Sequence, residues 1–422
     1  MIKVLAAIVV PPHLSVSGAA RAGELLSGAL ADKCDISVAN MMNEGGLVPE
    51  FRNPAVRHIP VRSWLPPLVP WSRLSNRYST LFYRSNLPDI VHDGDYDIVH
   101  IHNPMPALEM SRVARACLAR GIPYVVSTHG FNEIARGGSV YGFNLPRRLA
   151  WNTLVHTPVA RVVERASGIF ALSPADFDIV RGMGYSGAEL SVVSNGVSIP
   201  APSAPGSSSI LERFGIEAAR NPEQITCMFL ANHTPNKGLP VLLEAFAGMT
   251  RPYLLIVGGE TRSDIDYESY VKRCQPGQKI VITGRLEDNE VAAALGRSDL
   301  FVFPTLADTF PLVVLEAMAH GLPVLASRVG GIPYQVDQDC GMLVEPGDVT
   351  ALREAVVVLA EHPDRLAAMG HHARQHAAAQ FTWAKAADDA LAGYRRILRI
   401  AEQSAPTPSG ARTASLGKVP VG

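Results

Sequence analysis

The stretch of sequence that decides the fold is Pro304-Thr-Leu-Ala-Asp308-Thr-Phe-Pro-Leu-Val-Val-Leu-Glu316-Ala-Met-Ala-His-Gly321-Leu-Pro-Val-Leu-Ala-Ser327. The apolar run just before it, residues 300–303, predicts a buried strand, and residues 322–326 predict another. Between them a polar loop carries Asp308, and a helix containing Glu316 ends at Gly321. The loop therefore lies at the carboxyl end of a strand, where open α/β sheets bind ligands. A helix N-terminus beside two carboxylates suits a ligand that carries both hydroxyls and phosphates.

Short apolar strands alternate with helices along most of the chain, over residues 4–193 and again over residues 226–326. Such alternation predicts parallel sheets flanked by helices. Residues 198–209 are rich in Pro and Ser, which is typical of a linker. We therefore predict an α/β protein with two Rossmann-like domains and a cleft between them. The predicted segments are a first domain (1–197), a linker (198–222), a second domain (223–380), a last helix (381–402) and a disordered tail (403–422).

Composition places the chain among globular proteins with a large core. Of 422 residues, 47% are apolar and 18% are charged, and the net charge of −1 gives no bulk attraction to nucleic acid. The five cysteines are scattered, which favours reduced thiols in the cytoplasm over a disulfide framework. No apolar run reaches the roughly 20 residues of a membrane helix. Residues 1–10 resemble a weak signal peptide, but a first buried strand explains them better.

This stretch resembles the signature of retaining glycosyltransferases of family 4, through its acidic pair and the Ala-Met-Ala and Gly-Leu-Pro-Val that follow. The family pattern begins with a Glu, and in this chain Asp308 stands at that position. The resemblance implies the GT-B fold, with the last helix crossing back to the first domain. It also implies transfer of a hexose-type sugar from a nucleoside-diphosphate donor, of UDP or GDP type, to an acceptor hydroxyl. It implies no metal and no cofactor besides the donor, and a role in polysaccharide or glycolipid assembly.

The same resemblance implies roles for single residues. Glu316 matches the ligand of the donor ribose, and Asp308 matches a ligand of the donor sugar hydroxyls. Lys237, in Pro-Asn-Lys-Gly, matches a lysine that grips the diphosphate, and His129, in Ser-Thr-His-Gly, matches a histidine near the reacting centre. Gly18 matches part of a glycine-rich loop that approaches the diphosphate. We predict His129, Asp308 and Lys237 as catalytic residues.

The chain departs from the family pattern at two donor positions. Asn232 replaces an arginine that grips the diphosphate, and an Asn brings neither charge nor a bidentate fork. Arg285 is a candidate replacement. Pro311 replaces a Gly and removes one N–H donor, so Phe310 and Leu312 remain as the expected backbone donors.

Several alternatives stay open at the level of sequence. Asp308 could simply cap a helix, and Lys237 could be a solvated lysine. The two carboxylates could be those of a glycosidase, but their spacing and the α/β setting disfavour this. A non-catalytic nucleotide-sugar-binding protein and a GT-B epimerase of nucleotide sugars also stay open. Three histidines, His371, His372 and His376, suggest a metal, but no third acidic or Cys ligand is evident nearby, so we predict an exposed helix face.

In residues 51–87, the stretch between Phe51 and Leu87 has six arginines, five aromatic residues and no acidic residue. Three interpretations stay open: an ordinary loop packed on the first domain, a grip on a charged acceptor, or contact with an anionic membrane. We expect the acceptor to be a saccharide or a lipid-linked saccharide. We expect a cytoplasmic protein. If residues 51–87 contact an anionic membrane, this contact would be peripheral and at the inner face of the membrane.

Overall fold

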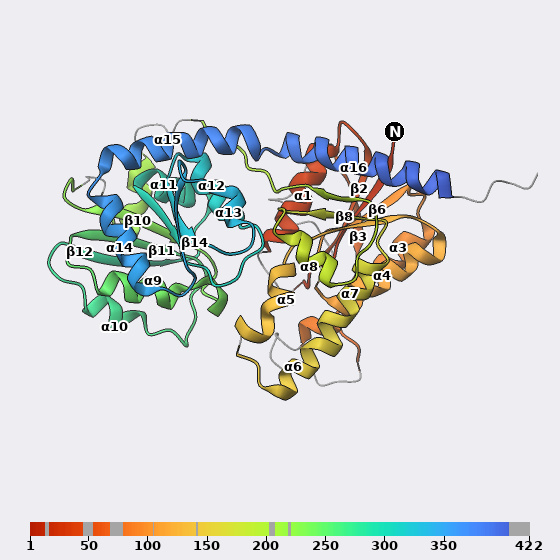
Figure 1. Cartoon of the computed structure of the whole chain (residues 1–422), viewed down its shortest axis with the longest axis horizontal. Coiled ribbons are helices and arrows are strands. Elements are labelled where there is room, and N and C mark those ends of the chain that lie inside the picture. Colours follow the sequence, from red (N-terminus) through yellow and green to blue (C-terminus); the bar gives the residue numbers. More distant parts are fainter. Residues whose placement is uncertain are drawn as a thin grey trace, which may run out of the picture.

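The computed structural model describes residues 1–12, 17–44, 54–67, 79–103, 105–140, 142–201, 207–217 and 221–404. Within them, two Rossmann-like domains lie side by side (Figure 1). Each is an α/β unit with its own parallel sheet, so the predicted fold class is confirmed. None of the described helices is both long and apolar enough to span a membrane.

The first domain has a sheet of seven strands in which all neighbouring strands are parallel. In spatial order the strands are β3 (Arg57–Val61), β2 (Asp35–Glu44), β1 (Lys3–Ile8), β6 (Ile98–Ile101), β7 (Tyr124–Ser127), β8 (Gly168–Ala171) and β9 (Leu190–Val192). The central strands are buried along almost their whole length, which explains their continuous apolar runs. The helices around them are α1 (Gly18–Leu30), α3 (Leu87–Asp93), α4 (Ala107–Arg120), α5 (Phe131–Val140), α6 (Leu145–Trp151), α7 (Thr157–Glu164) and α8 (Asp176–Gly182).

The second domain has a sheet of six strands, again parallel throughout. The spatial order is β12 (Gln278–Gly284), β11 (Tyr253–Gly258), β10 (Ile225–Leu230), β13 (Leu300–Phe303), β14 (Val324–Ser327) and β15 (Gly341–Val344). The order reverses between β10 and β13, and the loops at the carboxyl ends of these two strands form the switch point at which such sheets bind ligands. The helices are α9 (Leu239–Ala247), α10 (Tyr267–Lys272), α11 (Asp288–Arg297), α12 (Leu312–Ala319), α13 (Ile332–Gln335), α14 (Val349–Ala360) and α15 (Pro363–Gln380), and the last helix of the described chain, α16 (Trp383–Ser404), follows them.

Helix α16 crosses back from the second domain to the first, as predicted. Figure 1 shows α15 and α16 running one after the other over both domains. Tyr394 and Ile397 of α16 are buried in one core cluster with residues of β1, β6 and β8, and the Tyr394 hydroxyl lies 2.7 Å from Nδ1 of His100. Gly196 lets the chain pass close to the start of α16, because a Cβ there would lie 2.3 Å from the backbone nitrogen of Trp383.

Part of the segment between the two sheets is packed on the second domain. Residues Ser207–Phe214 form 3₁₀ turns, Leu211 and Ile216 are buried in the core of the second domain, and Arg213 pairs with Glu290. Of residues 51–87, the described part contains β3 and a short antiparallel pair, β4 (Ser63–Trp64) and β5 (Arg84–Ser85); residues 51–53 and 68–78 lie outside the described residues. The predicted tail lies outside them from residue 405 onward.

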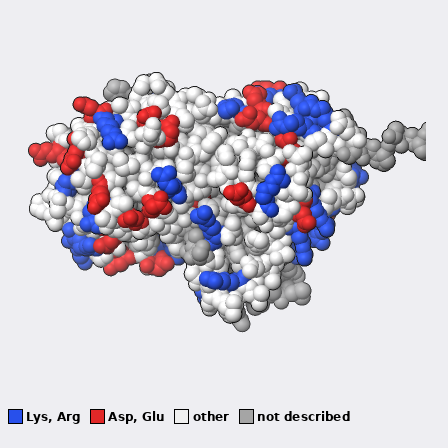
Figure 2. Space-filling view, viewed as in Figure 1, with Lys and Arg blue, Asp and Glu red and all other residues white. Residues whose placement is uncertain are grey.

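Charged side chains of both signs are interspersed on the face shown in Figure 2. This view agrees with the near-zero net charge of the sequence. We therefore see no single-sign field on this face of the kind that attracts nucleic acid.

Candidate active site

The loops that follow β10 and β13 are joined to each other at the switch point of the second sheet. The backbone carbonyl of Asn236 accepts hydrogen bonds from the N–H of Leu306 at 2.7 Å and from the hydroxyl of Thr305 at 2.8 Å. Gly238 allows this close approach, because its φ is +70° and a Cβ there would lie 1.9 Å from the carbonyl oxygen of Pro304. The Lys-Gly of the sequence motif thus places Lys237 against the loop that carries Asp308.

Lys237 and Asp308 form an ion pair at this junction. The distance between Nζ and Oδ2 is 2.5 Å, and the side chains are only 22% and 14% exposed. Burial opposes the charge of Lys237, but the carboxylates of Asp308 and Glu133 outweigh it and raise the pKa of the lysine. The site therefore holds a partly buried cation, a kind of group that can stabilise negative charge on a ligand.

The first domain adds two side chains to this cluster from the start of α5. The amide of Asn132 donates to the carbonyl of Asp308 at 2.8 Å, and Glu133 accepts from the amide of Asn236 at 2.9 Å. Burial, with Asp308 adding to it and Lys237 opposing it, raises the pKa of Glu133. Residues from both domains therefore surround Lys237.

A second contact between the domains involves Glu316, the predicted ribose ligand. Its carboxylate lies on α12, 3.1 Å from a guanidinium nitrogen of Arg21 on α1. Burial raises the pKa of Glu316, and Arg21 counteracts this. Glu316 is thus a partly buried acceptor that faces the first domain, which fits a carboxylate that receives hydroxyl hydrogen bonds.

His129 follows β7 and is 7% exposed. Burial lowers the pKa of this histidine to about 4, so its ring is neutral at pH 7. The ring makes no hydrogen bond with any of the described residues, and it remains available to a ligand. Its neighbour His100 has a structural role instead, because Nδ1 bonds Tyr394 and Nε2 lies 2.7 Å from the hydroxyl of Ser127.

The remaining predicted residues lie in the loops after β10, β12 and β13 or at the first residue of a helix. Asn232, after β10, and Arg285, after β12, are exposed. Gly18 begins α1 and has open space where a side chain would stand. Phe310 is buried and its carbonyl accepts from Asn195 at 3.2 Å. Leu312 begins α12, so its N–H has no partner within the helix.

Sequence reasoning missed four polar residues that complete the site: Arg21, Asn132, Glu133 and Asn236. Only Asn236 had a visible signal, because it precedes Lys237 directly in the predicted loop. The other three belong to the first domain, and their part in the site depends on how the two domains meet.

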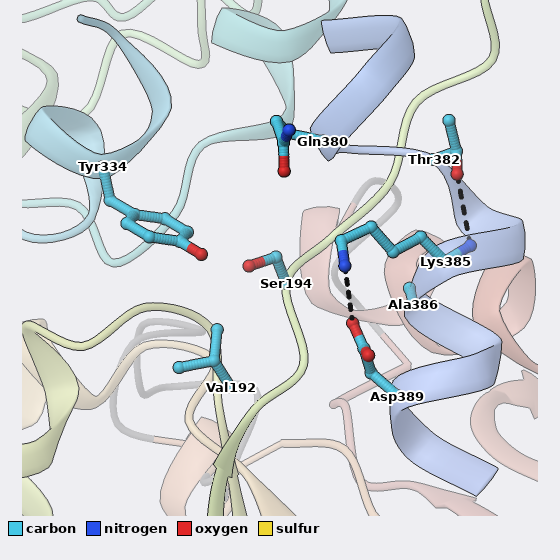
Figure 3. A pocket seen from close by; sticks show the side chains of 8 residues that line it. All are labelled: Val192, Ser194, Tyr334, Gln380, Thr382, Lys385, Ala386 and Asp389. Carbon is cyan, nitrogen blue, oxygen red and sulfur yellow. Dashed lines mark hydrogen bonds and ion pairs between the residues drawn. The ribbon is translucent and has the colours of Figure 1, made fainter. Parts of the chain in front are cut away.

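A separate pocket of about 240 Å³ lies beside the crossing of α16 (Figure 3). Tyr334 of α13, Ser194 and the ion-paired Lys385 and Asp389 are among its lining residues. It includes none of the predicted site residues. Its place between α13, α16 and the chain after β9 makes it a feature of the domain junction rather than of the switch point.

The expectation that no acidic or Cys ligand lies near the histidines of α15 is wrong. The structure places Asp337 and Cys340 beside His372 and His376, so acidic and thiol ligands do lie next to two of the three histidines. They come from a turn that is more than thirty residues away in sequence, which a reading of the helix alone could not detect.

The comparisons with known proteins agree with this fold. The family described as "Glycosyltransferase Family 4" matches residues 16–199, and the family described as "Glycosyl transferases group 1" matches residues 224–362. The two matched segments together cover both domains and most of the chain. This chain therefore belongs to the family 4 glycosyltransferases, group 1, and it is a GT-B enzyme of sugar transfer.

Two relatives and one solved structure illustrate the similarity. A D-inositol 3-phosphate glycosyltransferase of Segniliparus rotundus is 32% identical over 43% of this chain and 42% of that protein. D-inositol 3-phosphate glycosyltransferase 1 of Catenulispora acidiphila is 29% identical over 72% of this chain and 73% of that protein. The structure of Anabaena Alr3699/HepE in complex with UDP-glucose has a TM-score of 0.68 at 17% identity, covering 96% of this chain and all of that one, a likeness of fold.

Proposed function

We propose that this chain is a retaining hexosyltransferase that uses a nucleoside-diphosphate sugar of UDP or GDP type, without a metal or another cofactor at the donor site. The observation that carries the proposal is the partly buried cation Lys237, held at the switch point beside Asp308 and Glu133. Support comes from the Anabaena protein, whose structure holds UDP-glucose, and from the glycosyltransferase relatives.

Each of the four site residues has a proposed role that follows from its side-chain chemistry. Lys237 neutralises the diphosphate as the bond between the anomeric carbon and the phosphate oxygen breaks. Glu316 accepts from the ribose hydroxyls, Asp308 from sugar hydroxyls, and the neutral ring of His129 hydrogen bonds the sugar near the reacting carbon. The acceptor oxygen forms the new bond on the face that the phosphate leaves, and its proton passes to that phosphate oxygen. Catalysis then comes from positioning and charge stabilisation.

The acceptor is proposed to be a saccharide or a lipid-linked saccharide, reached by peripheral contact with an anionic membrane. The described part of residues 51–87 supports this with Trp64, which is 45% exposed. Helix α6 adds Leu145 and Leu149, which are 81% and 65% exposed, next to the exposed Arg147 and Arg148. Exposed apolar and basic side chains on one short helix are typical of a membrane-surface contact.

A screen of UDP, GDP and ADP sugars tests the proposal, with thermal shift as the binding assay and release of free nucleotide as the turnover assay. The variants are Lys237→Ala and, as a matched control, Lys272→Ala, whose side chain is 71% exposed on the same domain. We expect one donor to stabilise both the wild type and the control, and both to release nucleotide from it. The same donor should neither stabilise Lys237→Ala nor be turned over by it.

A second candidate function is favoured by the exposed Asn232 in the place of a diphosphate-binding arginine. A non-catalytic nucleotide-sugar-binding protein would be stabilised by a donor and would show no transfer with any acceptor tried. A chain that responds to no nucleotide would contradict both candidate functions.

A further inference from the structure

A cluster of four metal-ligand side chains lies in the second domain, away from the switch point. Asp337 and Cys340 lie on the turn between α13 and β15, and His372 and His376 lie on α15. One ligand atom from each of the four residues lies within 4.8 Å of those of the others. The family resemblance assigns none of them, and the proposed sugar transfer uses none of them.

The two histidines are held in position by helix geometry. They are four residues apart on α15, so their rings project from the same face, with an angle of 17° between the ring planes. Nε2 of His372 lies 3.7 Å from Oδ2 of Asp337, and Nδ1 of His376 lies 3.6 Å from the same oxygen. Zinc bonds of about 2.0–2.2 Å to nitrogen and oxygen place tetrahedral ligands about 3.3–3.5 Å apart. These two distances from histidine to Asp337 thus need only a few tenths of an ångström of closure, whereas the limit of 4.8 Å for all four ligand atoms leaves more closure to other pairs.

Asp337 is oriented for this role by its own turn. Its Oδ1 accepts from the N–H of Cys340 at 2.8 Å and from that of Asp339 at 3.0 Å, which leaves Oδ2 facing the two imidazoles. Hydrogen bonds from backbone N–H groups to a ligating carboxylate are the usual way in which metal ligands are fixed.

The histidines have no competing partners of ordinary hydrogen-bond length within the described part of the chain. Nε2 of His376 is buried without a partner, and both contacts to Asp337 are longer than a hydrogen bond. A buried imidazole nitrogen without a partner is costly, and coordination of the ion through Nε2 would remove that cost. Cys340 is fully buried beside them, whereas the side chains of Asp337 and His372 are 42% and 43% exposed, which leaves an entry path from solvent.

We propose that Asp337, Cys340, His372 and His376 bind a divalent transition-metal ion of the Zn²⁺ class. One thiolate, two imidazoles and one carboxylate match the ligand preferences of Zn²⁺ and do not match Mg²⁺ or Ca²⁺, which prefer oxygen ligands. Because all four ligands come from the protein, the site is closed and structural rather than catalytic.

The site joins the end of α15 to the sheet just before the chain leaves for the first domain. The ring of His376 lies 5.4 Å from that of Phe381, which in turn lies 5.8 Å from the ring of Phe310 in the loop after β13. The carbonyl of Phe381 accepts from the N–H of Val197 at 2.8 Å. A bound ion would therefore make the junction between α15 and α16 more rigid. This inference does not depend on the identity of the sugar donor.

Cobalt substitution and thermal unfolding of the metal-free full-length chain test the site without any activity assay. With Co²⁺, tetrahedral coordination that includes a thiolate gives intense visible bands and a thiolate-to-cobalt charge-transfer band, and we expect both at one ion per chain. With free Zn²⁺ at about 100 times its dissociation constant, the unfolding equilibrium constant should fall about 100-fold. Mg²⁺ should have no effect.

Two pairs of variants separate this site from other ligands on the chain. Cys340→Ser should abolish the charge-transfer band and Cys274→Ser should keep it; likewise His372→Ala should abolish the stabilisation by Zn²⁺ and His371→Ala, on the same helix, should keep it. His372 is half-exposed, so its variant remains informative even if Cys340→Ser does not fold. Absence of the cobalt bands from the wild type would overturn the proposal, as would equal Zn²⁺ stabilisation in His372→Ala and His371→Ala.

Discussion

Lowering the pH from 7 to 5 should change the stability of the first domain in opposite directions at two buried groups, His129 and Asp176. Burial lowers the pKa of His129 to about 4 from 6.5. The unfolded chain therefore binds this proton at a higher pH than the folded chain, so stability falls as the pH drops below 6.5. At about 1.36 kcal/mol per pKa unit, the loss from this residue between pH 7 and pH 5 is about 2 kcal/mol.

Asp176 has the opposite sign. Burial raises its pKa to about 6 from 3.8, although hydrogen bonds from Thr128 and the backbone N–H of Leu172 oppose this. The folded chain therefore binds this proton first as the pH falls, and stability rises by about 1 kcal/mol between pH 7 and pH 5. Because the two groups partly cancel in the wild type, each must be measured through its own variant.

The assay is urea unfolding of the wild type, His129→Gln and Asp176→Asn at pH 7 and pH 5, followed by tryptophan fluorescence. All four tryptophans lie outside residues 198–382, so the signal reports on the first domain and the crossing helix. From pH 7 to pH 5, the wild type should lose about 2 kcal/mol relative to His129→Gln and gain about 1 kcal/mol relative to Asp176→Asn. Differences that are the same at both pH values would refute the assigned pKa directions.

Three further predictions concern the backbone, the domain junction and the membrane surface. Gly238→Ala should destabilise the chain by at least about 2 kcal/mol in thermal unfolding, because φ is +70° and the Cβ would meet a carbonyl oxygen, whereas Gly182→Ala, with open space, should not. Asn132→Ala removes a hydrogen bond between the domains and should increase the radius of gyration in small-angle scattering; an unchanged curve would show that this bond does not hold the domains together. Replacing Leu145 and Leu149 by Ser should lower binding to anionic vesicles severalfold, and unchanged binding would exclude α6 as the contact.

The sequence predicted those parts of the structure that are formed by residues close together in the chain. The strand–loop–helix unit around Asp308 was predicted correctly, because apolar runs and turn residues record local structure directly. The crossing of the last helix was also predicted correctly, but that prediction came from the family resemblance. Strand β2 was missed, since Asp, Ser and two Asn interrupt its apolar pattern. The partners of Lys237 from the first domain were missed because a contact between domains leaves no periodicity in either segment.

The replacement of the family's arginine by Asn232 affects the balance of charges in the site. Lys237 is already paired with Asp308 and lies near Glu133, and Glu316 is already paired with Arg21. A diphosphate that bound as proposed would have to attract Lys237 away from Asp308 without help from a cation at position 232. Its binding would therefore be favoured by any movement that separates the domains and takes Glu133 away from the lysine, since a nearby carboxylate repels the phosphates. Donor binding and domain movement should thus be coupled more strongly here than in a site with two fixed cations.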